Sequence, residues 1–320
     1  MSAPRLVFLH TPEIEAFPYP ADCPFKTERA PLARRKLISL GLLGGPGQEE
    51  APFRKATDAE LCRIHTPAYL DELRRAAAGD LTVDALHLGI GGADTPVFAG
   101  MFDYGAWACG AGLTGCEMIL NNQADIVFNL YGGLHHAKAD HAGGFCYLND
   151  VALACLHLAE SGKRVAYLDL DAHHGDGVQS ILYERGDVLK ISLHESGHTL
   201  FPWSGFEDET GDGPGAGCNV NIPLPADVYD EAYMAIFREV ALPLLGAYQP
   251  DCLVLAIGMD ILAGDPLTHL RLSNNVVADC LRHLLDLNRP MLITGSGGYH
   301  VANCVRGWSL AWSVCLGEDQ

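Results

Sequence analysis

The amino-acid sequence predicts an α/β fold in which a central, mostly parallel sheet is flanked by helices on both faces. Short apolar runs rich in β-branched residues recur along the chain, and longer stretches of helical character separate them. Strands that are apolar on both faces and alternate with helices are typical of a parallel sheet that is buried on each side. A length of 320 residues fits one large α/β core, so we expect residues 1–320 to form a single domain.

Each predicted element follows from its local pattern. The apolar runs of strand length are Leu6–Leu9, Ile126–Leu130, Val165–Leu170, Val188–Leu193, Cys252–Ile257 and Met291–Thr294. The predicted helices are Asp103–Leu120, Asn149–Ser161, Asp227–Leu245, Asn274–Leu287 and Val301–Leu316. Two segments with several glycines, prolines and acidic residues are predicted to be surface loops, namely Leu43–Pro52 and Glu207–Gly217.

The bulk composition limits the classes of partner. Hydrophobic residues make up 48% of the chain and charged residues 19%, which is typical of a folded globular protein. The formal net charge of −19 disfavours direct binding to nucleic acid or to an anionic membrane surface, and it favours cationic ligands. The 11 cysteines form no CxxC pair, which is typical of reduced thiols. With neither a secretion signal nor a membrane-spanning apolar run in the sequence, we expect a cytoplasmic protein.

Polar clusters follow several of the predicted strands. They are GGLHH after Ile126–Leu130, DAHHGDG after Val165–Leu170, GMD after Cys252–Ile257 and GSGGY after Met291–Thr294. In open α/β sheets, ligands bind just outside the carboxyl ends of the strands. We therefore expect these clusters to meet at one rim of the sheet.

The clusters contain a candidate metal site. Asp169, Asp171 and His173 alternate along the end of a predicted strand, so their side chains can share one face. Carboxylates and imidazoles are good Zn²⁺ ligands, and a catalytic zinc site uses three protein ligands with one position open. Asp260, at the end of another strand, is the natural third ligand beside Asp171 and His173. The alternatives are a solvated loop that caps the next helix near Asp176, and a simple loop carboxylate at Asp260.

A histidine pair and a tyrosine complete the polar rim. His135 and His136 follow a Gly-Gly turn that can approach the site closely, and Asp169 and Asp176 are the carboxylates available to orient the two rings. Tyr299 ends the GSGGY segment and can donate a hydrogen bond to a developing oxyanion. The alternatives are a buried structural histidine pair and a tyrosine that only covers the next helix.

Several long motifs occur in a consistent order between Asp94 and Arg306. They are GGLHHAKADHAGGFCYLND (Gly132–Asp150), DLDAHHGDGVQ (Asp169–Gln179), ISLHE (Ile191–Glu195), GMDILAGDPL (Gly258–Leu267) and GSGGYHVAN (Gly295–Asn303). With these motifs the sequence resembles the zinc-dependent histone deacetylase family, which has the arginase–deacetylase fold. That family includes eukaryotic lysine deacetylases, bacterial acetoin-utilisation proteins and acetylpolyamine amidohydrolases.

The resemblance implies a role for each polar residue of the rim. The Zn²⁺ ligands would be Asp171, His173 and Asp260, and the same set accommodates Fe²⁺. The implied catalytic group contains His136 as general base and acid, His135 as its electrostatic neighbour, Asp169 and Asp176 as the carboxylates that orient them, and Tyr299 as the group that polarises the substrate carbonyl.

The resemblance also implies a substrate channel and a second ion. Asp94 would hold the substrate backbone at the rim, and the channel for the acyl-lysine side chain would be lined by Gly144 and Phe145, with Phe201 or Trp203. Leu267 occupies the gatekeeper position at which a polyamine-selective relative carries Glu. A buried monovalent-cation site, usually for K⁺, matches Asp169, Asp171, His173, Ser192 and Leu193.

The chain departs from the family pattern at a few places that bear on the pocket. Ser296 interrupts the usual glycine run, and Met259 precedes the metal-binding Asp260 where a smaller residue is common. The segments Leu43–Pro52 and Glu195–Gly217 have no clear counterpart, although such loops decide substrate choice.

The implied reaction is the hydrolysis of an acetyl or longer acyl group from a lysine side-chain amide, by water that the divalent ion activates. The alternatives are an acetylpolyamine or other small-molecule amidohydrolase, an arginase-like enzyme with two Mn²⁺ ions, and a non-catalytic acyl-lysine reader. The filled catalytic positions argue against the reader, and the engagement of Asp169 and Asp176 by histidines argues against a second metal. The sequence leaves open the metal, the acyl length, the choice between protein and small acylated amine, and whether the chain forms a homo-oligomer.

Overall fold

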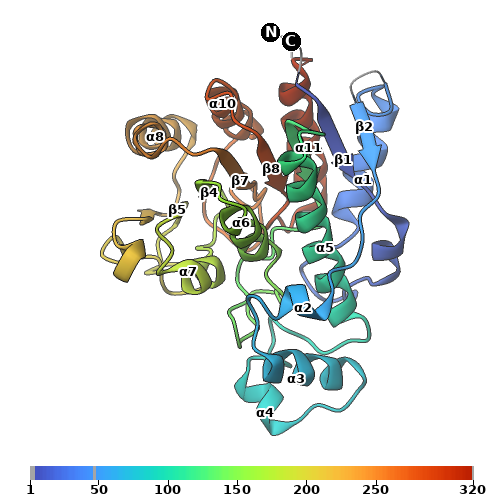
Figure 1. Cartoon of the computed structure of the whole chain (residues 1–320). Coiled ribbons are helices and arrows are strands. Elements are labelled where there is room, and N and C mark those ends of the chain that lie inside the picture. Colours follow the sequence, from blue (N-terminus) through green and yellow to red (C-terminus); the bar gives the residue numbers. More distant parts are fainter. Residues whose placement is uncertain (1–3, 46–47, 319–320) are drawn as a thin grey trace.

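The computed structural model describes residues 4–45 and 48–318, which form an 8-stranded sheet. The strand order across the sheet is β2-β1-β3-β8-β7-β4-β5-β6, and every neighbouring pair is parallel (Figure 1). This confirms the predicted α/β fold with a mostly parallel sheet. The strands are β1 (Leu6–Leu9), β2 (Gln48–Ala51), β3 (Ile126–Asn129), β4 (Val165–Asp169), β5 (Val188–Glu195), β6 (Asn219–Leu224), β7 (Cys252–Ala256) and β8 (Met291–Thr294).

Helices cover both faces of this sheet (Figure 1). They are α1 (Arg29–Ser39), α2 (Asp58–Leu61), α3 (Pro67–Ala77), α4 (Val83–His87), α5 (Met101–Leu120), α6 (Asp150–Glu160), α7 (Asp176–Leu182), α8 (Asp230–Ile236), α9 (Leu242–Tyr248), α10 (Asn274–Leu285) and α11 (Val301–Leu316).

Consecutive residues of a central strand point to opposite faces, and each face packs against its own helices. On one face, Val127 and Leu292 approach α5 so closely that a Cβ at Gly115 would lie 3.1 and 2.8 Å from their methyl carbons. On the other face, Phe128 packs edge-on against Trp312 of α11, with ring centroids 5.0 Å apart. Both sides of the strands are therefore apolar, which is the pattern from which the sheet was predicted.

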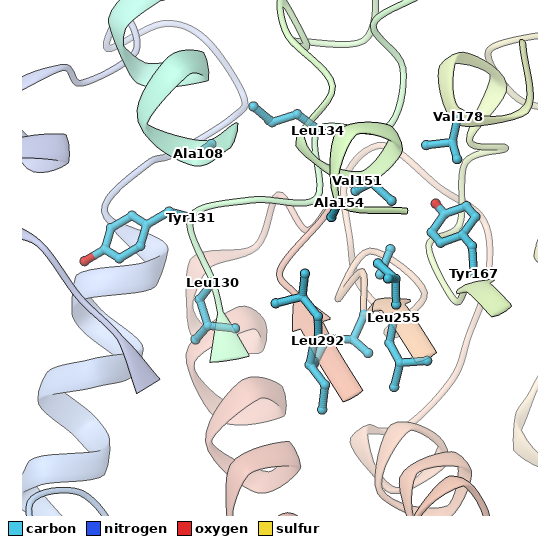
Figure 2. Packing of buried hydrophobic residues seen from close by; sticks show 14 of the residues in the cluster. Ala108, Leu130, Tyr131, Leu134, Val151, Ala154, Tyr167, Val178, Leu255 and Leu292 are labelled. Carbon is cyan, nitrogen blue, oxygen red and sulfur yellow. The ribbon is translucent and has the colours of Figure 1, made fainter. Parts of the chain in front are cut away.

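Helix α6 lies against the sheet beside α5. Its residues Val151 and Ala154 are fully buried and face the strand residues Leu255 and Leu292 (Figure 2). The helix begins where it does because the side chain of Asn149 accepts a hydrogen bond from the N–H of Ala152, as an N-cap should. This start places the whole preceding loop, residues 130–149, at the carboxyl end of β3.

The two edge strands were not predicted. The segment Leu43–Pro52 was expected to be a loop, but its residues Gln48–Ala51 form β2, while Pro46 and Gly47 lie outside the described residues, as do Met1–Ala3. β6 follows the other expected loop, Glu207–Gly217, which contains only a short 3₁₀ turn. β2 is polar, and in β6 two asparagines alternate with apolar residues, so neither strand has the uninterrupted apolar run that predicts a central strand. Each of them pairs on one side only.

The predicted helix Asp227–Leu245 is interrupted. The structure has α8, a π-helical turn over Phe237–Ala241 and then α9. Pro243 lies in the first turn of α9 and has no N–H to donate, so the α-helical hydrogen-bond ladder cannot run through it unchanged. The helices α1 to α4 were also not predicted, although Thr66 followed by Pro67 is a recognisable helix start.

Two further findings concern the cysteines and the helices. All 11 cysteines lie among the described residues and all are free thiols. Among residues 4–45 and 48–318, no helix has both the length and the apolar character needed to cross a bilayer.

Candidate active site

The predicted polar clusters do meet at one rim of the sheet. β3, β8, β7 and β4 are consecutive neighbours, and the loops that follow them carry the histidine pair, Tyr299, Asp260, and the Asp171–His173 segment. Because all strands are parallel, these loops leave the sheet on the same side. Residues far apart in the sequence thus form one site.

Asp171, His173 and Asp260 form a buried group that could hold a metal ion, since one ligand atom from each lies within 4.8 Å of the others. Nδ1 of His173 lies 2.9 Å from Oδ2 of Asp260 and 3.2 Å from Oδ1 of Asp171. The side chains are almost completely inaccessible to solvent. Two carboxylates and one imidazole are a donor set that suits a divalent cation with an open position.

Glycines and backbone donors shape the space around these carboxylates. A Cβ at Gly297 would lie 2.1 Å from Oδ2 of Asp260 and 2.6 Å from Oδ2 of Asp171, so only glycine leaves room for both. The N–H of Gly297 donates to Asp171 at 2.6 Å, and the N–H of Ala172 donates to Asp260 at 3.0 Å. The ligand oxygens are therefore oriented by fixed groups, as in built metal sites.

The electrostatics of the group also fit a cation. Burial raises the pKa of Asp260, and the nearby carboxylate of Asp171 raises it further, to about 7. Burial lowers the pKa of His173, but Asp171 and Asp260 outweigh burial and raise this pKa to about 10. Two buried carboxylates this close together repel each other, and a divalent ion bound by both would offset that repulsion.

His135 is held by Asp169. Its Nδ1 lies 2.8 Å from Oδ2 of Asp169, which also accepts a hydrogen bond from the hydroxyl of Tyr167. Burial lowers the pKa of His135, but Asp169 and Asp171 outweigh burial and raise this pKa to about 9. The carboxylate of Asp169 therefore favours the charged form of this ring.

His136 is held by a different carboxylate. Its Nδ1 lies 2.8 Å from Oδ1 of Asp176, and its Nε2 lies 3.0 Å from Nε2 of His135. Burial lowers the pKa of His136, and the neighbouring His135 lowers it further, against the opposing effect of Asp176. The pKa values of these two adjacent histidines are thus shifted in opposite directions, which suits a proton-transfer pair.

Tyr299 is fixed through its backbone. Its N–H donates to Oδ2 of Asp265 at 2.7 Å, and its ring stands at 90° to the ring of His173, with centroids 6.0 Å apart. Burial raises the pKa of the phenol well above its usual value, so it remains a hydrogen-bond donor at neutral pH. Asp265 is a positioning residue that the sequence did not single out, although it lies in the GMDILAGDPL motif.

A narrow cavity of about 190 Å³ reaches these groups, and its lining is largely apolar. Trp203 is absent from this lining and 63% exposed, whereas the neighbouring Phe201 belongs to it. Leu200 was not anticipated. The lining residues are Asp94, His136, Gly144, Phe145, His173, Leu200, Phe201, Leu267 and Tyr299.

Two lining positions have unusual backbone conformations. Gly144 and Phe145 have φ of 51° and 64°, and a Cβ at Gly144 would lie 2.3 Å from Cδ2 of His136. Asp94 fixes this turn, because its Oδ2 accepts the N–H of Gly144 at 2.7 Å and its carbonyl accepts the N–H of Phe145 at 2.9 Å. The turn therefore packs directly against the imidazole of His136.

The residues expected at the monovalent-cation site lie on the neighbouring strands β4 and β5 and in the loop that follows β4. Ser192 of β5 is paired with Asp169 of β4, and Leu193 is fully buried. The hydroxyl of Ser192 lies 2.7 Å from Nδ1 of His194, whose Nε2 lies 2.9 Å from the carbonyl oxygen of Gly205. With Nε2 donating to that carbonyl, Nδ1 accepts the hydroxyl proton, and the lone pairs of Ser192 stay free to face a cation.

A buried arginine supports the loop of Tyr299. Arg29 donates to the carbonyl oxygen of Gly298 at 2.6 Å and to that of Ser296 at 3.0 Å. Its guanidinium lies over the rings of Phe25 and Trp308, at 4.3 and 5.1 Å from their centroids. The sequence contained no signal for this role, because Arg29 precedes every motif.

Comparisons with known proteins agree with this architecture. The histone deacetylase domain family model matches residues 23–315. Histone deacetylase 2 of Oryza sativa subsp. japonica is 34% identical over 318 residues, covering 98% of this chain and 62% of that protein. Histone deacetylase RPD3 of Saccharomyces cerevisiae is 34% identical over 322 residues, covering 98% of this chain and 73% of that protein. The chain thus spans less than two thirds of the rice relative.

Solved structures give the same result. The crystal structure of an HDAC homologue complexed with SAHA has a TM-score of 0.90 at 33% identity and covers 99% of this chain and 84% of that chain. An HDAC homologue from Aquifex aeolicus has a TM-score of 0.90 at 32% identity, with 98% and 84% covered. With a family model over nearly its whole length and these relatives, the chain belongs to the histone deacetylase family of amidohydrolases, as its motifs predicted.

Proposed function

We propose that this chain is a Zn²⁺-dependent hydrolase that removes acetyl or longer acyl groups from lysine side-chain amides. One observation carries the proposal: a single narrow cavity is lined by the candidate ligand His173, the neutral imidazole of His136 and the phenol of Tyr299. These are a metal position, a base and an oxyanion donor around one point. Membership of the histone deacetylase family supports the same reaction.

The proposed reaction gives a separate role to the metal ligands, to His136 and to Tyr299. Asp171, His173 and Asp260 would hold the ion, which would serve as a Lewis acid for the substrate carbonyl and for water. His136 takes the proton of the attacking water at Nε2 and later returns a proton to the departing amine. Tyr299 donates a hydrogen bond to the tetrahedral oxyanion, a type of contact worth about 3–4 kcal/mol.

The two orienting carboxylates keep the histidines in their roles. Asp169 stabilises the positive charge of His135, whose Nε2 lies beside Nε2 of His136 and can replace a proton lost there. Asp176 accepts the Nδ1–H of His136 and so leaves Nε2 as the basic atom. Because both carboxylates serve histidines, they support a site with one ion rather than an arginase-like pair.

The cavity favours a slender substrate arm. At about 190 Å³ it is smaller than the roughly 300–1,000 Å³ of drug-sized ligand pockets. Phe145, Phe201 and Leu267 suit the methylene groups of lysine, and Leu267 offers no charge to a second amine, which disfavours an acetylpolyamine. Asp94 at the rim is the group we assign to the substrate backbone.

Further features of the proposal concern ions and location. Zn²⁺ is the metal we assign, with Fe²⁺ as the alternative that the same ligands accept. Asp169, Asp171, His173, Ser192 and Leu193 are the residues we assign to a structural K⁺ ion. The free thiols support a reducing compartment, and hence a cytoplasmic location.

The test is a turnover assay on metal-loaded protein, with a panel of acyl-lysine peptides from acetyl to long fatty acyl and a set of acetylpolyamines. We expect hydrolysis of acyl-lysine peptides, with Tyr299→Phe keeping its metal but losing about 10²–10³ in kcat. Asp260→Ala should lose the metal.

A protein that binds metal fully and acyl-lysine peptides tightly, yet hydrolyses nothing, would be a reader. Two Mn per chain would contradict the single-ion site, and full activity of His136→Ala would contradict its role.

A further inference from the structure

Asp176 has a second side-chain partner besides the histidine. Oδ1 faces Nδ1 of His136 at 2.8 Å, and Oδ2 lies 3.1 Å from Nζ of Lys138. The side chain of Asp176 is only 13% exposed, whereas that of Lys138 is 43% exposed. The lysine therefore reaches from solvent onto the buried carboxylate that holds the imidazole of His136.

The backbone of Lys138 is fixed on both sides. Its N–H donates to the carbonyl oxygen of His141 at 2.8 Å, and its own carbonyl oxygen lies 3.0 Å from Nδ1 of His65. The carbonyl oxygen of Ala139 accepts the N–H of Thr66 at 2.8 Å. An ordinary surface ion pair contributes about 0–1 kcal/mol because two mobile side chains must be ordered. Here the carboxylate is buried and the lysine backbone is fixed, so much of that ordering is already complete.

Lys138 lies beside a second cavity. This cavity of about 270 Å³ is lined by His136, Lys138, Asp176 and Phe201, among others. It shares Asp94, His136 and Phe201 with the substrate cavity, so it meets the same imidazole from a different side. The Asp176 carboxylate therefore borders this second cavity but not the substrate cavity.

The two histidine–carboxylate pairs differ in what faces the carboxylate. Asp169 accepts hydrogen bonds from His135 and from the neutral hydroxyl of Tyr167. Asp176 accepts from His136 and faces a lysine ammonium. A carboxylate whose charge is shared with an ammonium stabilises an imidazolium less well than an unshared one. The lysine ammonium is thus the contact that distinguishes the carboxylate of Asp176 from that of Asp169.

We propose that Lys138 is a positioning residue for His136. By holding Oδ2 of Asp176, it fixes the carboxylate so that Oδ1 accepts the Nδ1–H of His136, which leaves Nε2 as the unprotonated nitrogen of that ring. It also shares the charge of Asp176, which limits how strongly this carboxylate stabilises an imidazolium at His136. The inference rests on the proposed function, in which His136 is the general base.

The experiment uses the metal-loaded full chain with Lys138→Ala, Lys138→Arg and a control. We expect Lys138→Ala to lower kcat about 10-fold, the usual effect of removing a group that orients a site residue, with KM within twofold. Lys138→Arg should retain most of kcat. Propylammonium, which replaces the missing side-chain atoms in the second cavity, should restore part of kcat in Lys138→Ala, whereas propanol should not. Wild type with propylammonium shows any inhibition by the amine.

A matched control is Lys55→Ala. Lys55 also forms an ion pair with a carboxylate, Asp103, at a similar exposure of 36%, but on the outside of α5. Its loss should leave kcat unchanged. The proposal is overturned if Lys138→Ala keeps kcat within twofold of wild type, or if kcat falls and neither arginine nor propylammonium restores it.

A second readout does not depend on turnover. Nitrogen-15 NMR of the histidines, with the signals assigned by His136→Ala, reports which ring nitrogen of His136 carries the proton. We expect the Nδ1–H tautomer in wild type and a mixture of tautomers in Lys138→Ala. If wild type hydrolyses no substrate, the proposed function fails and the tautomer alone decides the role of Lys138. An unchanged tautomer in Lys138→Ala would count against that role.

Discussion

The hydroxyl oxygen of Ser296 lies 2.7 Å from Oδ2 of Asp171, a proposed metal ligand. Oδ2 of Asp171 also accepts the N–H of Gly297 at 2.6 Å. Ser296 is buried and has a φ of 65°, a conformation that glycine adopts more easily than serine. The residue that interrupts the glycines of the GSGGY segment is therefore strained, and its side chain contacts a proposed ligand carboxylate.

Ser296→Gly should separate these two effects. Glycine accepts the backbone conformation, so we expect the fold to be retained. The ligand Asp171 loses one of its hydrogen bonds, and we expect Zn²⁺ affinity to fall about 10-fold, as is usual when a ligand's supporting partner is removed. Metal affinity would be measured by competition with a chelator of known strength.

Ser313→Ala is the control for this substitution. Ser313 is also buried, but its hydroxyl donates to the carbonyl oxygen of Leu310 within α11 and has no contact with the metal group. The affinity of the Ser313→Ala variant for Zn²⁺ should equal that of wild type. Unchanged affinity in Ser296→Gly would mean that the backbone donors of Gly297 and His173 orient Asp171 without help from the Ser296 hydroxyl.

Neighbouring glycines provide a test of the turn beside His136. Gly144→Ala would place a Cβ 2.3 Å from Cδ2 of His136, in a residue whose φ is 51°, so the imidazole must move. We expect kcat to fall at least about 100-fold, since a misplacement of about 1 Å can have an effect of that size. Metal content should stay at the wild-type value. Gly143→Ala is the control, because a Cβ there meets nothing within 4 Å. Equal activity of the two variants would contradict the tight packing.

The metal group could be predicted because its determinants are local. Asp171 and His173 lie at the end of an apolar strand, where alternation places them on one side, and Asp260 follows another such strand. The rule that parallel strands present their carboxyl ends together then joins these segments. The central strands were found for the same reason, since being buried on both faces makes their residues apolar.

Other parts of the site depend on contacts that no local pattern records. Arg29 donates to Gly298, which lies 269 positions away in the sequence. Lys138 stands inside a recognised motif, but its ion pair with Asp176 requires the loop after β3 to lie against α7. The polar edge strand β2 gives no hydrophobic signal, because Glu49 and Glu50 are largely exposed and only β1 pairs with it. Long-range packing decides each of these features.

Arg29→Met should destabilise the fold. Methionine keeps much of the apolar contact with Phe25 and Trp308 but cannot donate to the carbonyl oxygens of Gly298 and Ser296. An unsatisfied buried acceptor costs about 1–3 kcal/mol, so we expect the free energy of unfolding to fall by about 3 kcal/mol in urea titrations. Arg35→Met, on an exposed position of the same helix, should change it by less than about 0.5 kcal/mol. Equal values for the two variants would contradict the role of Arg29.

His65 should make stability depend on pH. Its ring is buried, its Nε2 accepts the N–H of Asn149 at 3.1 Å, and its Nδ1 lies 3.0 Å from the carbonyl oxygen of Lys138. Burial lowers the pKa of His65 to about 4, against the raising effect of the Lys138 carbonyl. Between about pH 6.5, where an unfolded histidine titrates, and this folded value, the unfolded chain binds a proton that the folded chain does not. Stability from this group is therefore lost as the pH falls through that window.

His65→Gln tests this dependence, because glutamine can offer one donor and one acceptor but does not titrate. From the folded and unfolded pKa values, we expect His65 to contribute a loss of about 2 kcal/mol in the wild-type free energy of unfolding between pH 7 and pH 5. In urea titrations, the free energy of unfolding of His65→Gln should therefore fall by about 2 kcal/mol less than that of wild type between pH 7 and pH 5. Two other buried histidines, His174 and His194, also have pKa values lowered by burial, to about 4 and about 3, and they titrate alike in both proteins. The difference between the two curves thus isolates His65, and parallel curves would show that its protonation is not linked to folding.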